Sequence, residues 1–307
     1  MHDSTRPYRG RFAPSPTGPL HFGSLVAAVG SYLETHWNRG KWLVRMEDLD
    51  RPREVRGASA AILRMLEAYG FEWDGQVVFQ SRRDAAYGAA LKRLERERAV
   101  FPCACTRREI SDSALAVASE PIYPGTCRKG LSPGRSARAV RVRVDNTAIA
   151  FEDLLQGRIE QNLAREVGDF IVRRADGLFA YQLAVVVDDF EQSITDVVRG
   201  ADLLASTPRQ ILLQRLLGHP VPRYMHLPVV VNECGEKLSK QTLAAAIDAE
   251  HPLPELIRAL HFLGQDPPRT LAAASVRELW QWAIPEWRLE RVPRVRQLPA
   301  MPALQSG

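Results

Sequence analysis

The sequence has 307 residues, of which 45% are hydrophobic and 25% charged, a composition typical of a globular chain with one large or two modest cores. It contains no run of about 18 apolar residues, which excludes a transmembrane helix, and its N-terminus lacks the apolar stretch of a signal peptide, so we expect a cytoplasmic protein. The net charge of +5 is compatible with an RNA partner without requiring one.

The first hundred residues alternate short apolar strands with amphipathic helices. Strands are predicted at residues 8–13, 41–46 and 77–79. Between and after them, apolar residues at helical spacing begin near Ser24, Ile62 and Tyr87, and Gly70 is placed to end the second helix. The order β-α-β-α-β-α predicts an α/β fold with a parallel sheet covered by helices.

This alternation stops near Phe101. The following segment contains three cysteines, a stretch rich in Pro, Gly and Ser at 121–136, and one alternating strand at 139–144. We therefore predict a separate insertion at residues 101–175.

The α/β pattern resumes after the insertion and gives way to a short helical region. Elements are predicted at residues 181–187, 194–199 and 229–231. Another helix begins with Thr207 as N-cap and Pro208 at its first position, and ends at Gly218. One more helix is predicted at 253–260, and the Pro-rich tail from Pro293 is expected to fray. The predicted parts of the chain are therefore residues 1–100, 101–175, 176–245 and 246–307.

The segment from Arg11 to Ser24 has the layout of a strand, a Pro/Gly loop and a helix start. A helix N-terminus after a strand offers free N–H groups and the positive end of the helix dipole to an anion. His21 there can donate a hydrogen bond to a phosphate, and Gly23 lets an adenine ring approach the backbone. This indicates an ATP site, although a plain helix start with a partly buried histidine would explain residues 21–24 taken alone.

Lys237 and Lys240 lie on one loop that follows the strand predicted at 229–231. At this spacing both ammonium groups can point at one polyanion, and they would stabilise the β- and γ-phosphates of ATP as pyrophosphate leaves. A solvated surface loop is the alternative for this lysine pair.

Four further residues have charges complementary to an amino acid with two carboxylates and one ammonium. Arg11 and Arg199 can each bind a carboxylate, and Glu47 can accept the ammonium. Tyr181 can donate its hydroxyl nearby. All four are expected near strand ends or the first loop, where open α/β sheets bind ligands. Any one alone would more often be a surface charge or a core aromatic, but the set indicates a site for an amino acid with an acidic side chain.

Three cysteines form a second candidate site. Cys103, Cys105 and Cys127 suit tetrahedral Zn²⁺ bound by thiolates in a structural role, and Cys234 is expected to be unrelated. No histidine lies between residues 36 and 219, so the fourth ligand would be Tyr123, a carboxylate such as Glu120, or water. Three reduced, buried cysteines without a metal are the alternative.

Five segments resemble the catalytic core of the glutamyl-tRNA synthetases, which are class I enzymes with a Rossmann-like domain. They are residues 11–24, 43–50, 181–189, 197–200 and 237–241. The first and last are similar to the HIGH and KMSKS signatures. The resemblance covers most of residues 8–245 and is closest to the shortened glutamyl-Q tRNA(Asp) synthetase family.

The resemblance implies a ligase that uses ATP with Mg²⁺ to form glutamyl-adenylate without tRNA. That family transfers the glutamate to the queuosine base in the anticodon loop of tRNA(Asp). By resemblance the glutamate-binding residues are Arg11, Phe12, Ala13, Pro14, Ser15, Glu47, Tyr181 and Arg199. The ATP-binding residues are His21, Gly23, Ser24 and Lys240, the catalytic ones His21, Lys237 and Lys240, and the zinc ligands Cys103, Cys105, Tyr123 and Cys127.

Two positions depart from the signatures. Ser24 stands at the fourth HIGH position, a change that the glutamyl branch tolerates. Gln241 replaces the final KMSKS serine, so the role of that hydroxyl is lost or replaced. In addition, 67 residues follow Lys240, so we expect a monomer with a short helical C-terminal part and without an anticodon-binding domain.

Two other functions fit the same residues. One is a truncated glutamyl-tRNA synthetase that charges a tRNA 3′ end. The other is a non-catalytic RNA-binding paralogue, although the retention of His21 with both lysines argues against a lapsed enzyme.

Overall fold

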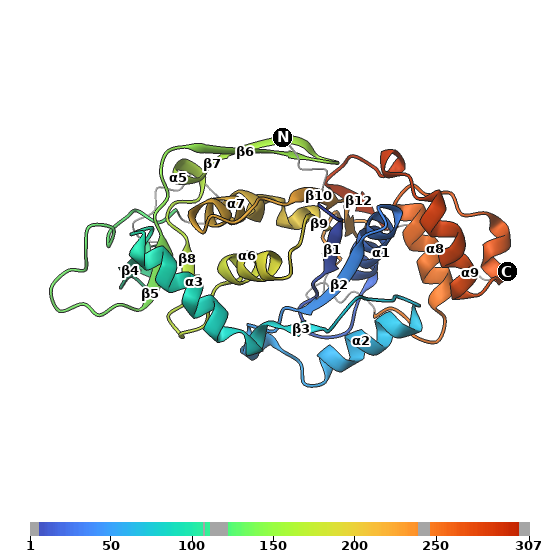
Figure 1. Ribbon diagram of the computed structural model, residues 1–307, viewed down its shortest axis with the longest axis horizontal. Helices are drawn as coiled ribbons and strands as arrows, with labels where there is room; N and C mark the ends of the chain where they lie inside the picture. Colours follow the sequence, from blue (N-terminus) through green and yellow to red (C-terminus); the bar gives the residue numbers. More distant parts are fainter. Residues whose placement is uncertain (1–5, 107, 111–121, 239–245, 301–307) are drawn as a thin grey trace.

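The computed structural model describes residues 6–106, 108–110, 122–238 and 246–300. The predicted parallel sheet of the first hundred residues is confirmed (Figure 1). Its strands are β1 (Arg9–Phe12), β2 (Lys41–Met46) and β3 (Val78–Phe79). The crossover connections contain helices α1 (Phe22–Trp37) and α2 (Ala58–Ala68), as the helical stripes predicted.

A second sheet continues this layer. Its strands are β6 (Ala148–Asp153), β7 (Gly157–Asn162), β9 (Asp196–Gly200) and β10 (Arg223–Leu227), in the order β7-β6-β10-β9. β9 and β10 are parallel, and the backbone N–H of Thr195 donates to the carbonyl of Arg9, which places β9 beside β1. The fold is therefore mixed α/β with parallel sheets. The order of the strands changes direction between β1 and β9, and open α/β sheets bind ligands at such a point.

Three helices accompany these strands. They are α3 (Asp84–Arg96), α6 (Tyr181–Glu191) and α7 (Thr207–Leu216). Two predictions were wrong in detail. Tyr181 begins a helix and does not lie near a strand end, and Ser206, not Thr207, is the N-cap of α7. The second shift arises because residues 201–206 already form a 3₁₀ helix that runs into α7.

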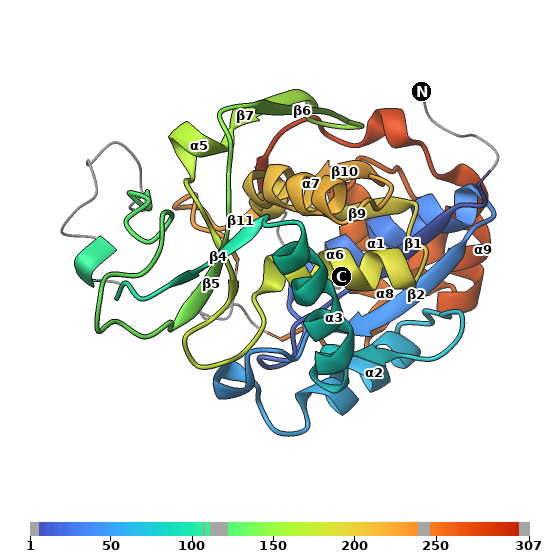
Figure 2. The ribbon, with the colours of Figure 1, turned by 60° about the vertical axis from the view of Figure 1, so that its left-hand side comes forward.

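The segment after residue 100 forms its own antiparallel sheet at one end of the molecule, at the left of Figure 1 and seen more openly in Figure 2. The strands are β4 (Val100–Cys103), β5 (Ala139–Val142) and β8 (Ile171–Arg173), and a short helix α5 (Leu163–Glu166) follows the β6–β7 hairpin. A small apolar cluster of Phe101, Ala104 and the cysteine region lies here, apart from the two larger cores. Its strands also contribute Val100, Val142 and Val172 to one of the larger cores, so it is the loops around the cysteines that share only the small cluster.

The expectation that the tail frays was wrong for residues 293–300, the part of the tail that the structure describes. β12 (Gln297–Pro299) pairs in parallel with β11 (Val229–Val231), and the N–H of Ala300 donates to the carbonyl of Val231. The tail satisfies backbone groups that an edge strand would leave unpaired, and Leu298 packs against the core. Pro299 can lie in this edge strand because its position requires no backbone N–H donor.

The C-terminal helices share a core with the N-terminal half. They are α8 (Pro252–Phe262), near the predicted 253–260, and α9 (Val276–Glu286), which was not predicted although Ser275 and Glu278 form a capping box. Leu25 of α1 and Leu256 of α8 belong to the same buried cluster. No helix in the described part of the chain has the length and apolar character needed to cross a membrane.

This shared core makes a prediction about stability. Leu256 is 0% exposed, so Leu256→Ala should lower the free energy of unfolding by about 2–5 kcal/mol in a single transition. Leu154, which is 37% exposed, provides the control, and Leu154→Ala should change it by less than about 0.5 kcal/mol. Urea denaturation followed by tryptophan fluorescence measures both. Two separate transitions would show that the C-terminal helices are an independent unit.

Candidate active site

A cavity of about 770 Å³ opens where β1, β9 and the start of α1 meet. Every predicted glutamate- or ATP-binding residue that the structure describes lines it: Arg11, Phe12, Ala13, Pro14, Ser15, His21, Gly23, Ser24, Glu47, Tyr181 and Arg199. Lys237 lines it too, whereas Lys240 and Gln241 lie outside the described residues. Segments that are far apart in the sequence thus converge on one space large enough for a nucleotide and an amino acid.

The first turn of α1 forms one wall of this cavity. His21 is the N-cap of the helix, and its Nδ1 accepts a hydrogen bond of 3.3 Å from the backbone N–H of Ser24. The other ring nitrogen, Nε2, lies 3.2 Å from the Ser24 hydroxyl. A Cβ at Gly23 would lie 3.2 Å from the His21 ring, so glycine permits this close approach. The ring and the helix terminus therefore present polar hydrogen atoms to the same region.

Lys237 lies across from α1, beside the root of the lysine loop. Its ammonium pairs with Asp202, which also lines the cavity. The loop is anchored by β11, because Val231 and Lys237 form an isolated β-bridge and the N–H of Leu238 donates to the carbonyl of Val230. Lys237 is thus a cation at the cavity wall that pairs with the carboxylate of Asp202.

A buried ionic junction lies beside the part of the cavity that Arg11 and Glu47 line. Asp189 accepts from Arg11 Nε at 3.1 Å and from Arg45 Nη1 at 2.8 Å, and Arg45 Nη2 lies 3.3 Å from Glu47. Burial alone would raise the pKa of Asp189, but Arg11 and Arg45 hold it below its usual value. For Glu47, burial outweighs the two arginines and raises the pKa. The junction fixes Arg11 and Glu47, which come from different strands, in one arrangement.

A second buried carboxylate extends the junction. Asp188 accepts from Arg83 Nε at 2.6 Å, from Gln80 Nε2 at 2.7 Å and from the Tyr87 hydroxyl at 2.9 Å, and lies 3.8 Å from Arg45. The sequence analysis assigned no role to Arg45, Asp188 or Asp189. The signal that could have found them was charge within apolar runs, since Arg45 interrupts a buried strand and the two aspartates follow three valines.

Arg199 lies on the neighbouring strand β9, and only its tip reaches the cavity. Its Nη1 is 3.5 Å from the Tyr181 hydroxyl, its Nη2 donates to Thr207 Oγ1 at 2.8 Å, and its Nε donates to His226 Nε2 at 3.1 Å. Burial raises the pKa of Tyr181 above its usual value, so its hydroxyl keeps its proton. Arg199 and Tyr181 therefore form a pair of donors opposite the junction.

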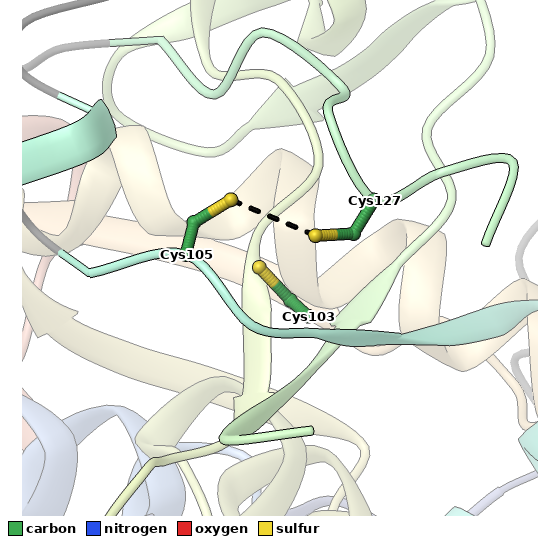
Figure 3. Close-up of side chains that lie close together, drawn as sticks. All are labelled: Cys103, Cys105 and Cys127. Atoms are coloured by element: carbon green, nitrogen blue, oxygen red, sulfur yellow. Dashed lines mark hydrogen bonds between the residues drawn. The ribbon is translucent and has the colours of Figure 1, made fainter. Parts of the chain in front are cut away.

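The three cysteines converge as predicted (Figure 3). Their sulfur atoms all lie within 4.8 Å of one another, with Cys105 Sγ and Cys127 Sγ 3.6 Å apart. The Tyr123 hydroxyl lies 3.6 Å from Cys103 Sγ and 3.9 Å from Cys105 Sγ. Tetrahedral zinc with Zn–S bonds of about 2.3 Å requires sulfur separations of about 3.8 Å. The three sulfurs are therefore compatible with zinc, and the Tyr123 hydroxyl lies next to them.

The surroundings of the cluster suit thiolates. The N–H of Ala104 donates to Cys127 Sγ, and Arg141 Nε donates to Cys103 Sγ at 3.4 Å. Burial raises the pKa of Cys105 to about 11, so its thiolate would form only beside a cation. Cys234 is exposed and takes no part in the cluster, while Glu120 lies outside the described residues.

The ionic junction makes a prediction about stability. Arg45 is 0% exposed and neutralises carboxylates of Glu47, Asp188 and Asp189, so Arg45→Met should destabilise the fold by about 3–5 kcal/mol because it leaves buried charge uncompensated. The control is Arg53→Met, whose salt bridge to Asp50 is exposed and should contribute less than about 1 kcal/mol. Denaturant unfolding measures both. Equal losses for the two variants would contradict a structural role for the junction.

Comparisons with known proteins agree with this geometry. Residues 8–267 match the family of class I tRNA synthetases (E and Q), catalytic domain. The chain is 60% identical over 300 residues to the glutamyl-Q tRNA(Asp) synthetase of Aromatoleum aromaticum, covering 98% of this chain and 95% of that protein. It is 61% identical over 290 residues to the enzyme of the same name from Dechloromonas aromatica, covering 94% and 96%.

A solved structure supports the fold independently. The glutamate tRNA ligase of Elizabethkingia meningosepticum, crystallised in complex with its amino acid, superposes with a TM-score of 0.80 at 23% identity, over 96% of this chain and 67% of that one. The protein is thus a ligase-type enzyme of the class I tRNA synthetase (E and Q) family, and within it the chain belongs to the glutamyl-Q tRNA(Asp) synthetases.

Proposed function

We propose that this enzyme activates L-glutamate with ATP in the absence of tRNA and then transfers it to the queuosine base in the anticodon loop of tRNA(Asp). The observation that carries the first half is the convergence of Arg11, Glu47 and Arg199 with the N-terminus of α1 in one cavity. This convergence supports the proposal, because Arg11 and Arg199 could bind two carboxylates and Glu47 one ammonium. They lie beside a helix terminus that is suited to phosphate.

From the charges around the cavity we infer which residue binds each charged group of glutamate. Asp189 holds the Nε and Nη2 edge of Arg11, which leaves the Nη1 edge to bind one carboxylate. Arg199 and Tyr181 supply donors for a second anionic group, and Glu47 accepts from the ammonium. In this arrangement the α-carboxylate reaches toward the α-phosphate of ATP while the rest of the substrate is held by opposite charge.

Activation needs no protein nucleophile. A carboxylate oxygen attacks the α-phosphorus, the bond to the bridging oxygen breaks, and pyrophosphate leaves as its Mg²⁺ complex. His21 and the α1 terminus would donate to phosphate oxygens in the transition state. Lys237 would exchange Asp202 for the leaving phosphates, and Lys240 would act beside it.

For the acceptor, the support is the name that the relatives carry, glutamyl-Q tRNA(Asp) synthetase, together with their high identity over nearly their whole lengths. A hydroxyl of the queuosine base would attack the adenylate carbonyl, form an ester and release AMP. Proteins read splayed bases in single-stranded loops, so an anticodon-loop base can enter such a cavity. A 3′-end-charging glutamyl-tRNA synthetase remains the competing function.

We propose that the active form is a monomer. The cluster of unpaired cysteines fits the reducing cytoplasm, where thiolates bind metals and do not form disulfides.

Activation can be tested by glutamate-dependent exchange of pyrophosphate into ATP, which should proceed without tRNA. Lys240→Ala should reduce the exchange rate by at least about 100-fold with little change in glutamate affinity, because the charge acts mainly as pyrophosphate leaves. Lys92, on the exposed face of α3, provides the control, and Lys92→Ala should be unaffected. Strict dependence on tRNA would refute tRNA-free activation, and loss of glutamate affinity alone would refute the role given to Lys240.

We further propose that Cys103, Cys105, Cys127 and Tyr123 hold one structural Zn²⁺. The spacing of the three sulfurs and the Tyr123 oxygen fits a tetrahedron, and Arg141 would offset the excess negative charge of three thiolates around a divalent ion. Bound zinc would tie together the loops around the cysteines, which share only a small apolar cluster.

Metal analysis tests this site. The purified protein should contain about one zinc per chain, and Cys103→Ser should lower that content and the stability of the segment more than the rate of adenylate formation. Tyr123→Phe asks whether the hydroxyl is the fourth ligand, since water or a carboxylate would leave zinc content unchanged. Cys234→Ser is the control and should retain zinc. A reduced, unchelated preparation without zinc would overturn the proposal.

A further inference from the structure

A chain of buried hydrogen bonds runs from Arg199 away from the cavity. Arg199 Nε donates to His226 Nε2 at 3.1 Å, and His226 Nδ1 lies 2.5 Å from Asp153 Oδ2. The side chains of His226 and Asp153 are both 0% exposed. We propose that His226 and Asp153 are positioning residues for the amino-acid substrate, because they hold the Arg199 guanidinium in the orientation that faces the cavity. The proposal rests on the proposed role of Arg199 in binding glutamate.

The backbone brings the three residues together. Arg199 on β9 and His226 on β10 are partners in the parallel register, so their side chains lie on the same face of the sheet. Asp153 is the last residue of β6, which pairs with β10 at Tyr224. This series of hydrogen bonds therefore crosses the adjacent strands β9, β10 and β6 and ends at Asp153, at the turn of the β6–β7 hairpin.

The direction of each hydrogen bond is determined by chemistry. Arginine nitrogen atoms only donate, so His226 Nε2 must be the acceptor and cannot carry a proton. The proton of the neutral ring is then on Nδ1, which donates a hydrogen bond to the Asp153 carboxylate. The Thr207 hydroxyl, 3.2 Å from His226 Nε2, is compatible with this because a hydroxyl can also donate.

The other oxygen of Asp153 is held equally firmly. Its Oδ1 accepts from three backbone N–H groups: those of Leu155 at 3.0 Å, Gln156 at 2.9 Å and His226 at 3.2 Å. Rotation of the carboxylate would sacrifice these bonds in a buried environment. Asp153 is thus a rigid acceptor that selects one tautomer of His226.

The ring is also kept neutral. The groups that face it are Asp153, the guanidinium of Arg199, the Thr207 hydroxyl and, in parallel stacking at 6.1 Å, the ring of Tyr224. Burial, aided by the positive charge of Arg199, lowers the pKa of His226 to about 4, although Asp153 opposes the shift. A neutral His226 keeps the lone pair of its Nε2 to accept the hydrogen bond from Arg199. It does not cancel the positive charge of the Arg199 guanidinium, which remains available to attract a carboxylate.

A buried His–Asp pair can also serve stability alone, so the test must separate positioning from folding. Asp153→Asn does this, since its carbonyl oxygen must take the place of Oδ1 to accept the three N–H groups. Its amide nitrogen then faces His226 Nδ1 and donates, which forces the ring proton onto Nε2 against Arg199 Nε. The variant keeps the shape of the site and inverts the tautomer.

The readouts are steady-state pyrophosphate exchange and the ¹⁵N NMR tautomer of His226. In Asp153→Asn we expect the proton to move from Nδ1 to Nε2, the KM for glutamate to rise by about 10- to 100-fold because Arg199 loses a buried acceptor, and the KM for ATP to stay within about twofold. Asp169→Asn is the matched control, since Asp169 is also buried and accepts from a backbone N–H, that of Val144, but lies in the β4–β5–β8 segment. Its glutamate KM should not change.

Variants of Thr207 test the proposal even if Asp153→Asn fails to fold. Thr207→Val removes the second anchor of Arg199 and should also raise the KM for glutamate, whereas Thr207→Ser should restore it. In a His226→Gln background, where no tautomer exists, adding Asp153→Asn should raise the KM for glutamate by less than about twofold further.

Each outcome distinguishes the two proposals. A wild-type enzyme without glutamate-dependent exchange would refute the proposed function. An active wild-type enzyme whose Asp153→Asn variant shows the inverted tautomer and an unchanged glutamate KM would refute only the positioning role. Equal increases in the KM for glutamate and for ATP would likewise refute it, because they indicate general structural damage.

Discussion

Asp189 accepts hydrogen bonds from two buried arginines, Arg11 of β1 and Arg45 of β2, at the point where α6 crosses the sheet. Each of these charges would be costly to bury alone, so the three elements can pack only with the charges in mutual contact. The packing of the sheet and the layout of the substrate cavity are therefore one constraint. Arg11 cannot turn away from the cavity, and Glu47 cannot leave the end of β2, without breaking the core.

The two arginines that face the cavity are held in different ways. Arg11 is bound to the carboxylate of Asp189, so part of its charge is already compensated. The direct partners of Arg199 are the neutral groups of Tyr181, Thr207 and His226, which orient the guanidinium without neutralising it. Arg11 therefore has one guanidinium edge left for a carboxylate, whereas the charge of Arg199 is not compensated by these partners. A substrate with two carboxylates matches this pair better than a substrate with one.

Much of this could be predicted from the sequence, because the information is local. The strand at 41–46 was predicted with its observed bounds since an apolar run with clear ends specifies it, and the cavity residues were found because they lie in short signature segments. Two of the features that were missed involve contacts between distant segments. The pairing of β12 with β11 depends on an open sheet edge that no pattern in the tail reveals. The contact of His226 with Asp153 joins residues 73 positions apart and arises only from strand order.

The central claim is that an enzyme with a glutamate-activating cavity delivers its product to a modified anticodon base. The most direct measurement is to incubate the enzyme with ATP and labelled glutamate, supply tRNA(Asp) with and without queuosine, and locate the label by nuclease digestion and mass spectrometry of the fragments. The account predicts label on the queuosine-containing anticodon-loop fragment and none on the tRNA(Asp) that lacks queuosine. Label on the terminal adenosine of tRNA(Glu) would contradict it and identify a 3′-end-charging synthetase.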